Sequence, residues 1–439
     1  MRLVQVIPGS GDIFYCENCL RDSGLVRGLR ALGHDAAVVP LYLPLSTAGE
    51  PTASDVPIFF GGINVYLQQR FGVFRRTPRW IDRLFDSPRL LRWAARRAGM
   101  TDPQVLAETT LSMLRGELGR QAKELDRLVE FLRRDPPEVV CLSNALLVGL
   151  ARRIGRELGS AVVCLLQDEE GFLEDFPEPL RAEAWAELRR RAADVDLFVA
   201  VSHYYARRMR ERLGLPAERV CVVSAGVDAE FFAPAGPGPD VPTIGYLSRL
   251  CRDKGLDLLV EAFVMLKAGG RFGTLKLRVA GGWTAGDVPF IDEVRGVLAR
   301  AGLAGEAEFL PNLPAEARRS FLRSLTVLSV PTRRPEALGL YILESLACGV
   351  PVVQPAHGAS AELLEATGGG VLVRPGDPAE LAGALAGLLA EPGEAGALGR
   401  SGRRAVEQHF TVQGMARDFS AACRRALKAR LERRPGPVD

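Results

Sequence analysis

Residues 330–353 read VPTRRPEALGLYILESLACGVPVV, and this stretch decides the fold class. An apolar run ends at Val330, and a polar loop follows it. Gly339 opens a mostly apolar segment that reads as a helix to about Cys348, and Val350–Val353 is a second short apolar run. Continuous apolar runs joined by a helix are typical of a parallel sheet that is covered on both faces. The stretch therefore predicts a strand–loop–helix–strand unit of an α/β protein.

The same alternation extends over the chain in both directions from this stretch. A segment rich in proline and glycine at 233–242 interrupts it once, as expected for a linker. We therefore predict an α/β fold of two Rossmann-like, doubly wound parallel-sheet domains joined near residue 236. The runs expected to be strands are Leu3–Ile7, Ala36–Pro40, Val139–Leu142, Ala161–Leu166, Leu197–Val201 and Val220–Val223, and then Thr243–Leu247, Leu275–Ala280, Ala307–Leu310, Val327–Val330, Val350–Val353 and Val371–Val373.

The predicted domains have the following bounds. Residues 1–232 form an N-terminal domain with a helical insertion at about 65–135, and residues 233–409 form a C-terminal domain. An amphipathic helix at 410–431 is expected to cross back to the N-terminal domain, and the tail 432–439 is expected to be disordered.

Composition narrows the class of protein. Hydrophobic residues make up 47% and charged residues 25%, which fits a globular enzyme and excludes a disordered or fibrous chain. The net charge of +3 gives no reason to expect a nucleic-acid partner. Most cysteines lie in apolar runs, and no apolar run is long enough for a signal peptide or a membrane-spanning helix. We therefore expect a cytoplasmic protein.

The segment 243–263, TIGYLSRLCRDKGLDLLVEAF, predicts an anion site. A strand ends in a short loop that presents Arg249 and, five residues later, Lys254 at the start of a helix. A helix N-terminus with two cations beside it favours phosphate, which Arg can hold through two hydrogen bonds. Ordinary surface charges on a solvated loop are the alternative.

Residues 330–353 predict a second part of a nucleotide site, beside the anion site of 243–263. Gly339 allows bare backbone N–H groups to approach a diphosphate. Glu344 shares a helix face with Leu340, where a carboxylate suits the two hydroxyls of a ribose, and Glu336 precedes the helix, where it can meet a sugar. The alternative is that neither glutamate binds a ligand, so that one is an ordinary exposed helix residue and the other an ordinary loop residue.

Taken together, these motifs resemble the retaining GT-B glycosyltransferases of family 4. The resemblance rests on SRL…KG at 248–255, on two Glu separated by seven residues, and on the ACGVPVV that follows them. It implies two Rossmann-like domains that face a central cleft. It also implies that Arg249 and Lys254 bind the donor diphosphate, that Glu344 holds the nucleotide ribose and that Glu336 contacts the donor sugar near the reacting centre. Further donor contacts are implied at Leu338, Gly339 and Leu340, at Gly281 in LRVAGG, and at Asn312 in FLPNLP.

The N-terminal half resembles the acceptor domain of this family less closely. Gly11 is expected near the donor phosphates with Asp12 beside it, in the first strand–helix loop. Many family members carry a His after the strand at 161–166, where this chain has Gln167, and Gln can hydrogen-bond a sugar hydroxyl but cannot accept a proton. Asp168 and His203 are further candidates for sugar or acceptor contacts.

Two other features of this half leave alternatives open. Cys16 and Cys19 form CENC, which suits zinc or a redox pair, although two partly buried thiols at a helix start are favoured over both. The basic stretch with Trp80 and Trp93 is compatible with peripheral contact to the inner face of a membrane, and also with packing on its own domain.

The predicted function is transfer of a sugar from a nucleotide-diphosphate donor to an acceptor hydroxyl, with retention of configuration and without a metal or other cofactor. The predicted partners are the nucleotide sugar and a glycan, lipid or small-molecule acceptor, with no nucleic acid. The alternatives are a nucleotide-sugar epimerase or a phosphorylase of the same architecture, and a non-catalytic nucleotide-sugar-binding protein.

Overall fold

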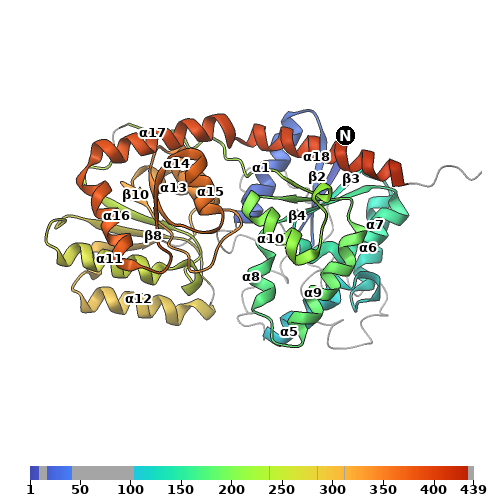
Figure 1. Ribbon diagram of the computed structural model, residues 1–439, viewed down its shortest axis with the longest axis horizontal. Helices are drawn as coiled ribbons and strands as arrows, with labels where there is room; N and C mark the ends of the chain where they lie inside the picture. The colour runs from blue at the N-terminus through green and yellow to red at the C-terminus, as the bar shows by residue number, and fades with distance from the viewer. Residues whose placement is uncertain (9–16, 42–102, 237, 284, 311, 434–439) are drawn as a thin grey trace, which may run out of the picture. The chain divides into compact units, whose positions relative to one another are not determined.

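The structure is a computed structural model that describes residues 1–8, 17–41, 103–236, 238–283, 285–310 and 312–433. These residues divide between two compact units (Figure 1). The N-terminal unit holds residues 1–8, 18–224 and 415–433, and the C-terminal unit holds Glu17 and Ala225–Gly414. Gly11, Asp12, Cys16 and the stretch with Trp80 and Trp93 lie outside the described residues.

Six parallel strands form the sheet of the N-terminal unit, in the order β2-β1-β3-β4-β5-β6. β1 therefore lies beside β3, and the connections run in opposite directions on the two sides of this pair. In open α/β sheets, ligands bind outside the carboxyl ends of the strands at such a switch point. The strands are β1 (Arg2–Ile7), β2 (Asp35–Pro40), β3 (Val139–Leu142), β4 (Ala161–Leu166), β5 (Leu197–Ala200) and β6 (Val220–Val222).

Helices cover both faces of this sheet. They are α1 (Glu17–Ala31), α5 (Pro103–Leu114), α6 (Ala122–Arg133), α7 (Ala151–Leu158), α8 (Glu169–Glu174), α9 (Leu180–Arg191), α10 (His203–Leu213) and α18 (Val412–Arg433), with 3-10 turns at Gly116–Leu118, Ala145–Leu150, Ala192–Asp194 and Ala217–Arg219.

The core of the N-terminal unit explains why its strands read as continuous apolar runs. Every residue of β3, β4 and β5 is buried, and alternate residues belong to a cluster with α1 and α18. Phe419 of α18 is fully buried in this cluster, and a side chain of its size contributes about 1.5–3 kcal/mol by leaving water. The last helix of the chain is thus part of the N-terminal core.

The C-terminal unit repeats the architecture with a second sheet of six parallel strands, in the order β12-β11-β10-β7-β8-β9. Its switch point lies between β7 and β10. The strands are β7 (Thr243–Leu247), β8 (Lys276–Ala280), β9 (Ala307–Leu310), β10 (Val327–Leu328), β11 (Val352–Pro355) and β12 (Gly370–Val373). These two sheets confirm the predicted fold class.

Within the C-terminal unit, α13, α14, α15 and α17 lie on one face of the sheet, and α11, α12 and α16 lie on the other (Figure 1). The helices are α11 (Leu256–Ala268), α12 (Val288–Arg300), α13 (Ala315–Arg323), α14 (Leu340–Ala347), α15 (Gly358–Thr367), α16 (Pro378–Ala390) and α17 (Pro392–His409), with 3-10 turns at Arg252–Lys254, Ala285–Asp287 and Ala304–Glu306.

The segment that follows β6 belongs to the C-terminal unit from Ala225 onward, earlier in the chain than the boundary expected at residue 232. Arginines of the C-terminal unit hold its backbone, because Arg403 donates to the carbonyl oxygen of Ala229 and Arg323 donates to that of Ala233. Composition indicates where proline and glycine interrupt the alternation, but these contacts decide which unit the segment joins.

Candidate active site

The loop after β7 carries two predicted cations and is held in place by buried groups. The hydroxyl of Tyr246, which is fully buried, donates to the carbonyl oxygen of Arg249 at 2.9 Å. Gly255 follows Lys254 with a φ of +71°, and a Cβ there would lie 1.9 Å from the carbonyl oxygen of Pro331. Glycine is therefore needed where this loop approaches the loop after β10.

Lys254 and Glu336 come from the two loops that flank the switch point, and they form an ion pair. The hydroxyl of Tyr341 donates to the second oxygen of Glu336 at 2.8 Å. Burial raises the pKa of Tyr341 well above its ordinary value, and the nearby Glu336 raises it further, so this hydroxyl keeps its proton and acts as a donor. The Glu336 side chain is 8% exposed, and each of its oxygens has a partner in a largely buried place.

Arg249 has a partner that the sequence did not reveal. Its Nη2 lies 3.1 and 3.0 Å from the two carboxylate oxygens of Asp287, and its Nε lies 3.3 Å from one of them. The Asp287 side chain is 10% exposed and the Arg249 side chain 47%. Asp287 thus occupies the Nε–Nη2 edge of the guanidinium, while nearly half of the Arg249 side chain stays exposed.

Glu344, the predicted ribose ligand, is also paired. Nε of Arg318 on α13 lies 3.2 and 3.1 Å from its two oxygens, and both side chains are buried. Sequence reasoning missed Arg318, since nothing in its local pattern separates it from the other arginines of its helix. A buried carboxylate that is oriented by a guanidinium is ready to accept hydrogen bonds from hydroxyls.

Three predicted donor-contact segments surround these residues. Gly339 has a φ of +81° and is the N-cap of α14, so Leu338 and Leu340 flank a left-handed residue at the start of that helix. Gly281 follows β8 with a φ of +144°, and a Cβ there would lie 1.7 Å from the carbonyl oxygen of Ser248. Asn312 lies shortly after β9 and is partly buried. All of these positions are at the carboxyl ends of the strands.

In the N-terminal unit, the predicted contact residues differ in where their side chains lie. The Gln167 amide is 2% exposed and donates to the carbonyl oxygen of Ser143 and to Asp22, so it faces into its unit. Asp168 follows it with a φ of +78°, a left-handed conformation that Asp and Asn adopt more readily than most residues other than Gly. His203 is exposed at the first position of α10.

The two other acids after Gln167 have structural partners. Glu169 is buried and accepts hydrogen bonds from the backbone N–H of Ala145 and from the Tyr205 hydroxyl, while burial raises its pKa. Glu170 pairs with arginines of α10. The contact of Asp168 with sugar or acceptor stays a prediction. In the described part of the chain, no three His, Cys, Asp or Glu side chains group as metal ligands would.

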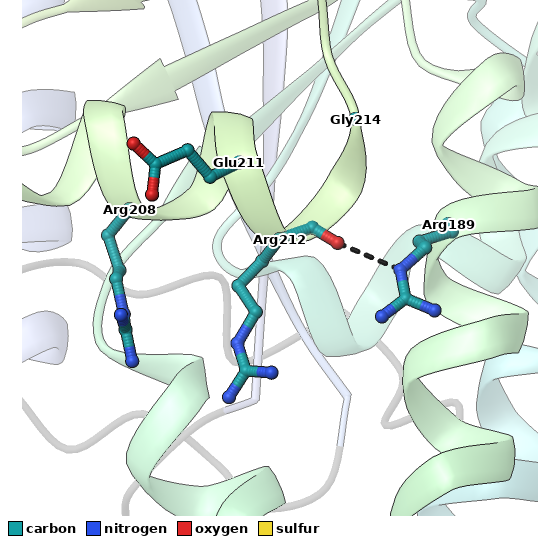
Figure 2. Close-up of a pocket in the computed structure, with 5 residues that line it drawn as sticks. All are labelled: Arg189, Arg208, Glu211, Arg212 and Gly214. Carbon is teal, nitrogen blue, oxygen red and sulfur yellow. Dashed lines mark hydrogen bonds between the residues drawn. The ribbon is translucent and has the colours of Figure 1, made fainter.

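A separate concave surface of the N-terminal unit lies at the end of α10 (Figure 2). Arg189, Arg208, Glu211, Arg212 and Gly214 line this pocket of about 530 Å³. Nε of Arg189 donates to the carbonyl oxygen of Arg212 at 2.8 Å, and Arg208 and Arg212 are both paired with a carboxylate of α8. Two of its three arginines are thus paired with a carboxylate, and none of the predicted site residues lines this pocket.

Comparison with known proteins identifies the family. Residues 228–405 match the model of the glycosyl transferases group 1, and residues 102–231 match that of glycosyltransferase family 4. The chain is 30% identical over 344 residues to a D-inositol 3-phosphate glycosyltransferase of Frankia alni, covering 73% of this chain and 80% of the relative. The chain belongs to this glycosyltransferase family. The resemblance to family 4 glycosyltransferases is thereby confirmed.

Other relatives of this chain match over a smaller share of their length. A D-inositol 3-phosphate glycosyltransferase of Acidothermus cellulolyticus is 32% identical over 281 residues, or 60% of this chain and 61% of the relative. The chain spans about three fifths of the length of the first such relatives. HepE of Anabaena, solved in complex with UDP, is 17% identical with a TM-score of 0.67, and the match covers 96% of this chain and 99% of HepE. That likeness shows the two-domain GT-B fold.

None of the helices that the structure describes has the length and the apolar character that crossing a membrane requires.

Proposed function

We propose that this glycosyltransferase moves a sugar from a nucleotide-diphosphate donor to an acceptor hydroxyl, with retention of configuration and without a metal. The observation that carries the proposal is the pair of loops at the β7/β10 switch point, which bring Lys254 and Glu336 into contact and place Arg249 on the same loop as Lys254. Cations for a diphosphate and a carboxylate for a sugar stand at the edge of the sheet where α/β proteins bind ligands.

The proposed chemistry uses charge rather than covalent catalysis. The bond between the sugar C1 and the phosphate oxygen breaks, so negative charge grows on the leaving diphosphate. Arg249, Lys254 and the start of α14 would stabilise that charge in place of a metal ion. The acceptor oxygen bonds to C1 on the same face, and its proton passes to an oxygen of the leaving phosphate. Retention follows from this same-face attack.

The carboxylates take the remaining roles. Glu336, which Lys254 and Tyr341 hold, would accept hydrogen bonds from the donor sugar, and Lys254 would then share its charge between Glu336 and the diphosphate. Glu344, oriented by Arg318, would accept the ribose hydroxyls. Gly281, Asn312 and the backbone from Leu338 to Leu340 would line the rest of the donor site.

The donor is proposed from the comparisons. HepE was solved with UDP, and the Frankia and Acidothermus relatives are named for transfer involving D-inositol 3-phosphate. UDP-sugars and inositol-phosphate acceptors are therefore the first to test, beside GDP and ADP donors and other polyols.

The test is a panel of nucleotide sugars with nucleotide release as the signal and calorimetry for donor affinity. Arg249→Ala with Lys254→Ala should raise the Kd of the preferred nucleotide by at least about 100-fold, because each charge-assisted hydrogen bond contributes about 1.5–3 kcal/mol. Arg252→Ala is the matched control, since Arg252 lies on the same loop but pairs with Asp257 and Glu293. Unchanged affinity in the double variant refutes the diphosphate assignment.

Three further readouts separate the finer claims and the alternatives. NMR of the product anomer tests retention, and full activity in EDTA tests metal independence. An altered sugar from donor alone would indicate an epimerase, and turnover that requires inorganic phosphate would indicate a phosphorylase. Donor binding with no turnover over a broad acceptor set would indicate a binding protein.

A further inference from the structure

A buried polar cluster lies at the switch point of the N-terminal sheet. Gln5 is on β1, Ser143 directly follows β3, Gln167 directly follows β4, and Arg21 and Asp22 are on α1. Each of the five is at most 4% exposed. The cluster thus occupies, in the N-terminal unit, the place that the β7/β10 loops occupy in the C-terminal unit.

The members of this cluster are linked through Asp22. Nη1 of Arg21 lies 3.2 Å from one Asp22 oxygen, and the Gln167 amide nitrogen lies 3.3 Å from the same oxygen. Gln5 lies beside the same carboxylate. Asp22 therefore serves as the counter-ion that keeps the Arg21 charge compensated inside the protein.

The cluster nevertheless leaves several donors unused. Among the described residues, Arg21 Nε and Nη2 and Ser143 Oγ have no hydrogen-bond partner, and Gln167 Oε1 lacks a donor. Nε and Nη2 are the two nitrogens on one edge of the guanidinium, and that edge binds both oxygens of a carboxylate or phosphate side-on. A buried charged group with idle N–H bonds is costly, and such a group in a native fold calls for a bound ion or water.

We infer that the free edge of Arg21 is an oxyanion-binding subsite of the N-terminal unit. Arg21 provides the side-on pair of N–H donors, and the Ser143 hydroxyl is the neighbouring donor that completes a site for a carboxylate or phosphate group. Arg21 and Ser143 offer donors and the guanidinium carries a positive charge, so an anion rather than a cation matches the cluster. We assign this carboxylate or phosphate group to the acceptor. That assignment rests on the proposed function, whereas the anion site itself does not.

The first test measures anion binding by calorimetry on the full chain. The Arg249→Ala/Lys254→Ala background removes the proposed donor-phosphate site, and inorganic phosphate, acetate and chloride are compared at equal ionic strength. Phosphate or acetate should bind with a stoichiometry of one and chloride should not. Arg21→Met should weaken binding at least about 30-fold, and Arg21→Lys, which keeps the charge but lacks the side-on edge, should weaken it about 10-fold.

Control variants keep this test decisive. Arg27→Met alters an exposed arginine of the same helix and should leave binding unchanged. Ser143→Ala removes a single donor and should weaken binding about 5-fold even if Arg21→Met fails to fold. Absence of phosphate and acetate binding in the background protein, or binding that Arg21→Lys and Ser143→Ala leave intact, overturns the inference and assigns the idle donors to water.

The second test asks whether the anion is free or carried by the acceptor. A neutral polyol is compared with its monophosphate as acceptor, with the donor held at saturation. Arg21→Met should lower kcat/KM at least about 30-fold for the monophosphate and less than about 3-fold for the neutral polyol, with an unchanged donor Kd. Equal losses for both acceptors contradict an acceptor role. If the wild-type protein does not bind any nucleotide-sugar donor, the proposed function is refuted, whereas the phosphate site at Arg21 is still tested by the first experiment.

Discussion

Replacing Tyr341 by Phe removes one hydrogen bond from the proposed catalytic carboxylate and changes almost nothing else. The side chain is fully buried, its hydroxyl lies 2.8 Å from Glu336 Oε2, and Phe conserves the ring, so the variant opens almost no cavity. A hydrogen bond to a charged group contributes about 1.5–3 kcal/mol, and 1.36 kcal/mol corresponds to a factor of ten in rate. We therefore expect kcat for sugar transfer to fall by about 10- to 150-fold, with little change in donor KM.

The assay is the initial rate of nucleotide release with the preferred donor, beside urea unfolding of both proteins. Tyr246→Phe is the matched control, because Tyr246 is equally buried but donates to a neutral acceptor, the Arg249 carbonyl oxygen. A neutral hydrogen bond contributes about 0.5–1.5 kcal/mol, so this control should lower kcat/KM by only about 2- to 12-fold. A wild-type kcat in Tyr341→Phe, or equal kcat losses in both variants, would refute the positioning of Glu336 by Tyr341.

Three other outcomes test the packing around the two switch points. Arg318→Met leaves the buried Glu344 carboxylate without its guanidinium and should lower the unfolding free energy by about 3–5 kcal/mol, whereas a loss below about 1 kcal/mol in urea contradicts a buried pair. In Gly255→Ala the new Cβ meets a backbone oxygen, so the free energy of unfolding should fall by more than about 3 kcal/mol. Gly302→Ala is the control, since Gly302 also has a positive φ but nothing lies near its Cβ position, and its fall should be about 1 kcal/mol. Equal falls in the two variants would exclude the clash. Burial raises the pKa of Asp22 from 3.8 to about 6, so between these pH values the folded chain holds a proton that the unfolded chain has lost. The free energy of unfolding should therefore fall by about 3 kcal/mol as pH rises through this window. Urea unfolding at pH 4 and 7 should show a smaller fall in Asp22→Asn, and an equal fall in both proteins would disprove this reasoning.

The local sequence pattern was sufficient to predict the helices and strands, and to predict which loops carry the residues of the proposed donor site. The apolar runs are strands because both faces of each sheet are covered, and the loops after β7 and β10 present Arg249, Lys254 and Glu336 where the spacing placed them. Such features depend on backbone periodicity and on turn residues, which a window of about ten to twenty residues contains.

Such a window does not predict which residues pair when they lie far apart in the sequence. Tyr341 stands five residues after Glu336, on the first turn of the following helix, and could have been suspected. Asp287 and Arg318 carried no comparable signal, because each is one charged residue among many until the fold brings it to its partner.

The sequence by itself determined the α/β class and the repeated strand–helix units, and it predicted which cations and carboxylates would form a donor site. Only the tertiary structure decided that Lys254 contacts Glu336, that Arg318 orients Glu344, and that Gln167 turns inward to Asp22. The physical reason is strand order. β7 lies beside β10 and β1 beside β3, and these adjacencies come from crossover connections that no local pattern encodes.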